Sequence, residues 1–254
     1  MQRYFIQLSY DGTNYHGWQF QPNGLSVQQV LEQALTIVAR EDIAVTGAGR
    51  TDAGVHASFF VAHFDAENST LDAEKITYNL NSLLPSDVAV QKIYKVSELA
   101  HARFDALSRK YNYYIVKQKN PFKRQFATKE SRIPDLELMN QAAQKLFNYI
   151  DFTSFSRVGT DVKTNNCKIV LAHWTEQPDG YVFTITADRF LRNMVRAIVG
   201  TLLEVGFRKL TIDEFCAIIE AKNRSSAGAS VPANGLFLVD IVYPPEMSQG
   251  LVRL

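Results

Sequence analysis

The order of strand-like and helix-like segments in the first half of the chain is what most constrains its fold. Residues 4–10 alternate between two faces in the manner of a strand, and the turn-forming run of residues 11–14 ends that strand. Ser26 and Gln29 have the spacing of a helix capping box, and an apolar stripe continues from there to Val38. The chain is therefore expected to open with a strand followed by a helix.

The rest of the first half adds three more strand patterns and one more helix. Short strand-like runs cover residues 43–45 and 58–62, and a helix pattern then begins near Leu71 and stops at Pro85. Residues 88–96 have the pattern of a closing strand. The resulting order, β-α-β-β-α-β, is that of the split βαβ plan.

The second half follows the same order with additional segments. Strands are predicted over residues 111–116, 167–174, 181–186 and 236–242, and helices from Pro134 and over residues 190–205 and 211–221. We therefore predict an α+β fold of two βαββαβ (ferredoxin-like) halves, residues 1–105 and 106–254. The halves are expected to join into one extended, mainly antiparallel sheet with helices on one face and a central cleft. Clefts between domains are common binding sites, so we expect the functional site there.

Composition gives no support to metal or cofactor chemistry. The five histidines lack HxxxH or HExxH spacing, and Cys167 and Cys216 are too few for a thiolate metal site. The dinucleotide, P-loop and G-x-S-x-G motifs are also missing. No apolar run approaches the ~20 residues of a membrane span, and the first residues read as a strand rather than a signal peptide. We expect a cytoplasmic protein with no metal, no cofactor and no membrane partner.

Charge gives a divided indication about a nucleic-acid partner. The formal net charge is only +1. Between Arg103 and Arg132, however, nine basic residues stand against two acidic ones, and six aromatic residues lie among them. A basic, aromatic segment suits phosphate contacts and base stacking, but a solvated strand and loop have the same composition. The two interpretations are evenly balanced on the charge pattern alone.

The run GAGRTDAGVHA, from Gly47 to Ala57, is the most informative stretch for function. It places Asp52, with Arg50 beside it, in a glycine-rich turn between two strand-like runs. A turn aspartate commonly caps its own backbone, which is a purely structural role. A lone carboxylate can also act as a nucleophile or a proton acceptor, and Arg196 in the second half is a possible partner. The run by itself leaves both interpretations open.

An RNA-recognition module is an alternative for the first half. Residues 58–64 place aromatic side chains on a strand of a βαββαβ unit, as such modules do. The basic-Gly-aromatic opening of that module is absent, so the match is partial. Alternating aromatics on a strand belong more often to a core than to a stacking surface.

Several ordered motifs along the chain resemble those of the TruA-type tRNA pseudouridine synthases. The run over residues 49–57 resembles the family's catalytic signature. The other matching stretches are YDGTNYHGWQ at 10–19, HARFDA at 101–106, RKYNY at 109–113, DFTSF at 151–155, FLRNMVR at 190–196 and PANGL at 232–236. Asp105 stands where the family has a small hydroxyl residue, and Arg192-Asn193 where an aromatic residue and a histidine are usual. These departures bear on local RNA contacts.

The resemblance implies a reaction and a set of roles. Uridine would be detached from its ribose at N1, turned, and rejoined through C5, without a cofactor or a metal. Asp52 would be the catalytic carboxylate, while the resemblance leaves open whether it attacks the ribose, attacks the ring, or removes a proton. Substrate binding would fall to Tyr111, stacked on the target base; Arg50, filling the space of the flipped nucleotide; Arg196, pairing with Asp52; and Leu191.

The resemblance also implies a substrate and an assembly. The substrate would be tRNA, modified on the 3′ side of the anticodon stem-loop at positions 38–40, and the target base would leave its stack at a cost of a few kcal/mol. The protein would be a homodimer. A non-catalytic RNA-binding protein on the same scaffold is the alternative, although a carboxylate that faces a polyanion would cost such a protein affinity.

Overall fold

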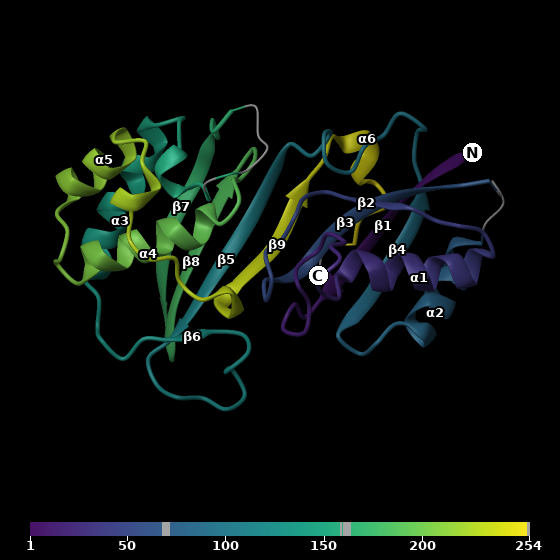
Figure 1. Ribbon diagram of the computed structural model, residues 1–254, viewed down its shortest axis with the longest axis horizontal. Coiled ribbons are helices and arrows are strands. Elements are labelled where there is room, and N and C mark those ends of the chain that lie inside the picture. Colours follow the sequence, from purple (N-terminus) through teal and green to yellow (C-terminus); the bar gives the residue numbers. More distant parts are fainter. Residues whose placement is uncertain (68–71, 158, 160–163, 253–254) are drawn as a thin grey trace. The chain divides into compact units, whose positions relative to one another are not determined.

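The computed structural model describes residues 1–67, 72–157, 159 and 164–252, and the chain forms two compact units. The first unit comprises Met1–Ser108 together with the chain from Leu238 on, and the second comprises Arg109–Phe237. Each unit has its own strands and its own helices (Figure 1).

The strands of the first unit pair mainly in antiparallel fashion. β1 (Gln2–Tyr10) lies between β4 (Val88–Lys95) and β3 (His56–Ala66) and is antiparallel to both. The short β2 (Val45–Gly47) pairs antiparallel with β3, and β9 (Leu236–Val242) follows β3 in the strand order. The predicted opening strand and the two strands around the glycine-rich run are therefore present.

Two amphipathic helices cover one side of these strands. α1 (Val27–Ala39) and α2 (Ala73–Leu83) contact each other, and both lie on the same side of the sheet (Figure 1). Ser26 caps α1 by accepting a hydrogen bond from the Gln29 N–H, which is one of the two bonds of the predicted capping box. Asp72 caps α2 in the same way, whereas Leu71, the expected start of this helix, lies outside the described residues.

The C-terminal segment returns to the first unit and covers the other face of β1. Gln7 exchanges two hydrogen bonds with the backbone of Val252, at 2.6 and 2.7 Å. The Tyr243 ring packs 5.4 Å from the ring of Phe5, and α6 (Pro245–Ser248) belongs to the same segment. Both faces of β1 are buried as a result. The segment lies within the predicted half of residues 106–254 and belongs to the first compact unit.

The second unit is built on the antiparallel trio β5 (Ser108–Val116), β8 (Gly180–Ala187) and β7 (Ile169–Gln177), in that order. A two-residue strand, β6 (Thr128–Lys129), runs parallel to β5. Its helices are α3 (Leu136–Lys145), α4 (Met194–Gly206) and α5 (Ile212–Glu220), which contact one another. Short 3-10 turns cover residues 146–148, 153–155, 224–226 and 233–235.

In each unit, one asparagine side chain forms hydrogen bonds to the backbone of one residue on an outer strand. In the first unit, Asn81 of α2 accepts from the N–H and donates to the carbonyl of Val90 on β4, both at 2.8 Å. In the second unit, Asn140 of α3 makes the same pair of bonds to Trp174 on β7, at 2.7 and 3.1 Å. Unpaired strand edges are templates for pairing with another chain, so these side chains close part of each edge.

The structure confirms the α+β class and the mainly antiparallel pairing. The helix predicted from Phe190 begins later, at Met194, because Asn193 has a left-handed backbone (φ 66°) that no helix interior accommodates. The cleft between the halves stays a prediction. Among the described residues, no helix has the length and apolar character to cross a membrane.

Candidate active site

The glycine-rich run forms the predicted turn between β2 and β3. The carbonyl of Asp52 accepts a hydrogen bond from the Val55 N–H at 3.1 Å, and Gly54 has φ +76°. A positive φ at the third position is what a type II turn requires, and glycine adopts it without strain. Asp52 is half-buried at the first corner of the turn, and Arg50 is exposed two residues before it.

A second loop, residues 11–18, is hydrogen-bonded to this turn on both sides of Asp52. The hydroxyl of Tyr10 lies 2.9 Å from Oγ1 of Thr51, and the Trp18 N–H donates to the Thr51 carbonyl at 3.3 Å. On the other side, the Gly54 N–H donates to the Tyr15 carbonyl at 3.2 Å. The backbone that carries the Asp52 side chain is therefore fixed by the loop that follows β1.

Two glycines of this second loop allow the close approach. A Cβ on Gly12 would clash with the carbonyl of Val55, and a Cβ on Gly17 would clash with that of Thr51. Gly17 also has φ +91°, which side chains other than hydrogen rarely tolerate. The two loops are thus in backbone-to-backbone contact, and any side chain at either glycine would push them apart.

The second loop is itself anchored to buried and charged groups. The Gly12 N–H donates to Nδ1 of His56 at 3.0 Å, and the carboxylate of Asp11 lies 3.0 Å from the same nitrogen. Tyr15 donates its hydroxyl proton to Asp87 at 2.6 Å. Burial, followed by that hydrogen bond, raises the pKa of Tyr15, so this tyrosine stays neutral and keeps donating.

Aromatic side chains pack against one another in the core next to the turn. Trp18 stacks on Phe60 of β3 with ring centroids 4.1 Å apart, and Tyr10 packs against both rings. Phe59 and Phe64 on the same strand are also buried. The aromatics of β3 therefore belong to the core, and they do not form the exposed stacking surface of an RNA-recognition module.

The second unit holds the other predicted site residues on regular elements. Tyr111 lies on β5 opposite Ile185 of β8, is partly exposed, and meets Phe190 edge-on with centroids 5.2 Å apart. Leu191 is buried. On α4, Nε of Arg196 donates to the Val231 carbonyl at 2.8 Å, while its own carbonyl accepts from the Val231 N–H. The bond to Val231 therefore fixes the orientation of the Arg196 guanidinium.

Both departures from the family pattern have local structural roles. Asp105 accepts a hydrogen bond from the His101 N–H at 2.7 Å and closes the turn of residues 101–105, a bond that a small hydroxyl side chain can also accept. Asn193 provides the left-handed residue before α4, which asparagine tolerates well, and donates to Ser230 at 2.6 Å. The side chains of Asp105 and Asn193 therefore each form a hydrogen bond that stabilises the local backbone.

The structure thus brings Arg50 and Asp52 together in one loop of the first unit, and Tyr111 together with the segment of Leu191 and Arg196 in the second. No sequence pattern predicts which residues fix the Asp52 turn, namely Tyr10, Gly12, Gly17, Thr51 and His56. A signal is present in the sequence, because Gly12 and Gly17 lie within seven residues of the end of a strand. In the sequence these glycines indicate the end of the strand and belong to the family motif of residues 10–19, but they do not indicate a contact with the Asp52 turn.

The basic segment of residues 103–132 is partly neutralised within the protein. Lys117 pairs with Glu176 at 2.7 Å, and Lys123 with Asp179 at 2.6 Å. A further pair joins Arg132 to Glu130 within the segment. The excess of positive charge is therefore smaller than the sequence suggests.

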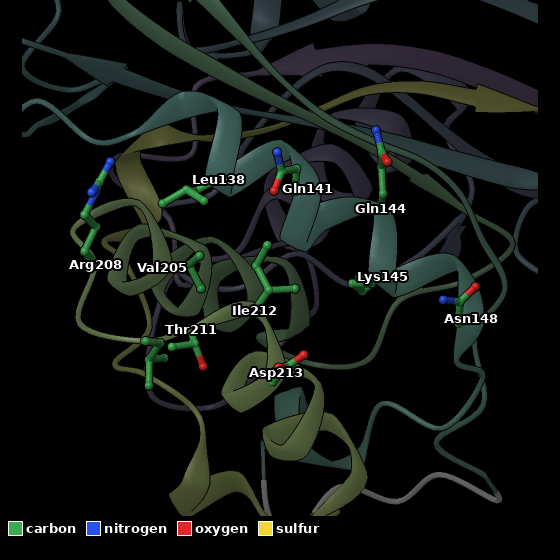
Figure 2. A pocket seen from close by; sticks show the side chains of 11 residues that line it. Leu138, Gln141, Gln144, Lys145, Asn148, Val205, Arg208, Thr211, Ile212 and Asp213 are labelled. Atoms are coloured by element: carbon green, nitrogen blue, oxygen red, sulfur yellow. The ribbon is translucent and has the colours of Figure 1, made fainter.

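Two further features of the structure concern sites other than the Asp52 turn. In the described ranges, no group of three or more His, Cys, Asp or Glu side chains is placed to hold a metal ion. A cavity of about 780 Å³ lies in the second unit between α3 and the start of α5, lined in part by Gln141, Lys145 and Asp213 (Figure 2). None of the predicted site residues lines it.

Comparison with known proteins identifies the family. The family model described as tRNA pseudouridine synthase matches residues 7–105 and 142–244. The tRNA pseudouridine synthase A of Bacteroides fragilis is 58% identical over 248 residues, covering 97% of this chain and 98% of that protein. That of Parabacteroides distasonis is 58% identical over 247 residues, with 97% and 98% covered.

A more distant relative, the tRNA pseudouridine synthase A of Bacillus subtilis (strain 168), is 41% identical over 240 residues, covering 93% of this chain and 97% of that protein. The similarity thus extends over nearly the full length of every protein compared, and the matched residues include the Asp52 turn with the loop that holds it. The chain belongs to the tRNA pseudouridine synthase family, in its TruA branch.

Proposed function

We propose that this protein isomerises uridine to pseudouridine in tRNA, on the 3′ side of the anticodon stem-loop at positions 38–40, with Asp52 as the essential carboxylate. The enzyme class, a pseudouridine synthase, follows from the family. The observation that carries the assignment of Asp52 is the turn itself: a half-buried carboxylate on a backbone that a second loop holds from both sides. Such fixation is what positioning a reactive group requires.

The reaction breaks the bond between C1′ and N1 of uridine and forms a bond between C1′ and C5. The C5 proton leaves and N1 gains one, so atoms balance without a cofactor. Asp52 acts either as the nucleophile or as the base that begins this sequence. Free space next to the turn is consistent with a close approach of the nucleotide, since a Cβ placed on Gly49 would meet no atom within 4 Å.

The remaining roles follow from the family and from where the side chains lie. Tyr111 stacks on the detached base, and its exposed area and edge-on contact with Phe190 suit a fixed ring. Arg50, exposed beside the turn, fills the space that the flipped nucleotide vacates. Arg196, whose Nε donates to the Val231 carbonyl, pairs with Asp52, and Leu191 contacts the base. These roles require the two units to converge on one site.

Release of tritium from tRNA tests this function. A tRNA transcript that carries tritium at C5 of its uridines releases the label to water when C5 becomes the glycosidic carbon. Wild-type protein should release it, and a matched transcript with cytidine at positions 38–40 should release none. Binding of the first transcript without any release would instead favour a non-catalytic RNA-binding protein.

The assembly and the compartment are proposals as well. We propose a homodimer, in which one tRNA contacts both subunits, that works in the cytoplasm. Light scattering should give twice the 28.7 kDa mass of one chain. A monomer mass at working concentration would contradict the dimer.

A further inference from the structure

The loop that joins β5 to β6, residues 117–127, exposes two aromatic rings, Phe122 and, to a much smaller extent, Phe126. Phe122 is 90% exposed. Single exposed apolar residues are common on protein surfaces and need no explanation by themselves. The structure of the loop and its charge provide further evidence about this ring.

The loop around Phe122 is ordered by its own hydrogen bonds. The side chain of Asn120 accepts from the Phe122 N–H at 2.9 Å, which is an Asx-turn, and its carbonyl accepts from the Lys123 N–H. The carbonyl of Lys123 then accepts from the N–H groups of Phe126 and Ala127, both at 2.9 Å. The backbone on both sides of the ring is therefore fixed.

Other segments of the second unit hold the loop in place. Nδ2 of Asn234 donates to the carbonyls of Arg124 and Ala127, both at 3.0 Å. Asp179, in the turn between β7 and β8, pairs with Lys123 and accepts from the Lys117 N–H. A ring held outward on a fixed loop loses little conformational entropy when a ligand covers it.

The charge around the ring is positive and not fully neutralised. Lys119 and Arg124, both exposed, form no ion pair with a carboxylate in the part of the chain that the structure describes. Lys117 and Lys123 are paired with Glu176 and Asp179. An exposed ring flanked by available cations suits a nucleotide, because the base stacks while the cations contact phosphates.

We propose that Phe122 stacks on an unpaired nucleotide of the bound tRNA, with Lys119 and Arg124 contacting the neighbouring phosphates. This nucleotide is not the target uridine, because Tyr111 and Val116 are five residues apart on β5, roughly 17 Å, and the loop begins beyond Val116. The proposal rests on tRNA being the substrate of the proposed function.

Substitutions at Phe122 test the stacking through tRNA affinity. Phe122→Ala and Phe122→Leu should each weaken the Kd for tRNA about tenfold, a loss of ~1.4 kcal/mol, and raise KM in parallel, because each removes the stacking on one base. Phe122→Trp should restore wild-type affinity, because it restores an aromatic face. Tyr78→Ala is the matched control: Tyr78 is 75% exposed, on α2 of the other unit, and its removal should leave Kd and KM unchanged.

The salt dependence of binding separates stacking from charge. Phe122→Ala should weaken affinity without changing the slope of log K against log salt, because stacking releases no counterions. Lys119→Gln should lower that slope by about 0.7–0.9. A changed slope in Phe122→Ala would mean that the loop has moved, which would overturn the stacking role.

Fluorescence of Phe122→Trp gives a direct signal. Trp18 and Trp174 are buried, so the new indole would supply the solvent-accessible emission. tRNA should quench that emission, and wild-type protein should show no matching change. Quenching by tRNA but not by a fully paired RNA duplex would support an unpaired nucleotide.

Two outcomes keep this inference separate from the proposed function. If wild-type protein releases tritium from tRNA and Phe122→Ala binds tRNA with wild-type affinity, the stacking role is wrong, and Phe122 does not contact the bound tRNA. If wild-type protein neither binds nor modifies tRNA, the proposed function itself fails.

Discussion

The two units supply their candidate site residues by different physical means. Asp52 in the first unit sits on an irregular turn whose geometry depends on a second loop, two glycines and a hydroxyl pair. Tyr111 and Arg196 in the second unit sit on a strand and a helix, which hold their own backbones. A site residue on a loop therefore needs neighbours that fix it, and the first unit should be the more easily broken by small changes in the backbone.

The largest effect away from Asp52 itself is expected at Gly17. Gly17→Ala should reduce the rate of tritium release about 100-fold. A methyl group at this position would meet the Thr51 carbonyl and displace Asp52, and displacement of a reacting group lowers the reaction rate by about two orders of magnitude. The positive φ adds ~1–2 kcal/mol of strain. The measurements are single-turnover tritium release and urea unfolding.

Gly49→Ala is the matched control for stability. Gly49 lies in the same glycine-rich run, but an added Cβ meets nothing within 4 Å and its φ is not positive. Its free energy of unfolding should stay within ~0.5 kcal/mol of wild type. Equal activity in Gly17→Ala and wild type would show that Asp52 does not depend on the second loop.

A smaller effect is expected for Tyr111 when an aromatic ring is kept. Tyr111→Phe retains the edge-on contact with Phe190 and should slow catalysis by about tenfold, the loss of one hydroxyl group. Tyr111→Leu loses the ring and should lose tRNA turnover and base stacking together. Because pairing with β8 fixes the backbone of β5, the free energy of unfolding of each variant should lie within ~1 kcal/mol of the wild-type value. Wild-type activity in Tyr111→Leu would exclude the stacking role.

A different kind of effect, on stability and not on catalysis, is expected in acid and again falls on the first unit. Burial, with help from Arg3 and His101, lowers the pKa of His63 to about 4, against about 6.5 in the unfolded chain. The neutral ring accepts a hydrogen bond from the Ala102 N–H at 3.1 Å.

Because the folded pKa is the lower one, stability from His63 is complete above pH 6.5 and is lost as pH falls towards 4. Between pH 7 and pH 5 the free energy of unfolding should fall by on the order of 2 kcal/mol. His63→Gln, which can accept the same bond, should show a smaller fall. Equal pH dependence in both proteins, followed by urea unfolding, would assign the acid sensitivity elsewhere.

Local patterns predicted much of the fold because they act over short distances. The Ser26 cap, the β1 pattern and the turn at Asp52 each depend on a few neighbouring residues, and each is present. The sequence places the start of α4 too early, because the apolar pattern already includes Phe190 and Leu191. Nothing in that pattern indicates that Asn193 has a left-handed backbone.

Contacts between distant segments could not be predicted. The return of the chain to Gln7 and the pairing of Lys123 with Asp179 join residues far apart in sequence, and neither has a periodic pattern. The same holds for the contact of Gly17 with the Asp52 turn. What the sequence could indicate at the site was therefore the reactive residue and its family, whereas the groups that fix it depend on tertiary structure.

Asp52→Asn tests the central claim most directly, because it removes the charge and keeps the shape of the side chain. In a single-turnover assay with protein in excess over tritium-labelled tRNA, the account predicts no release above background, with a Kd for tRNA close to that of wild type. Release at a rate near that of wild type would contradict it.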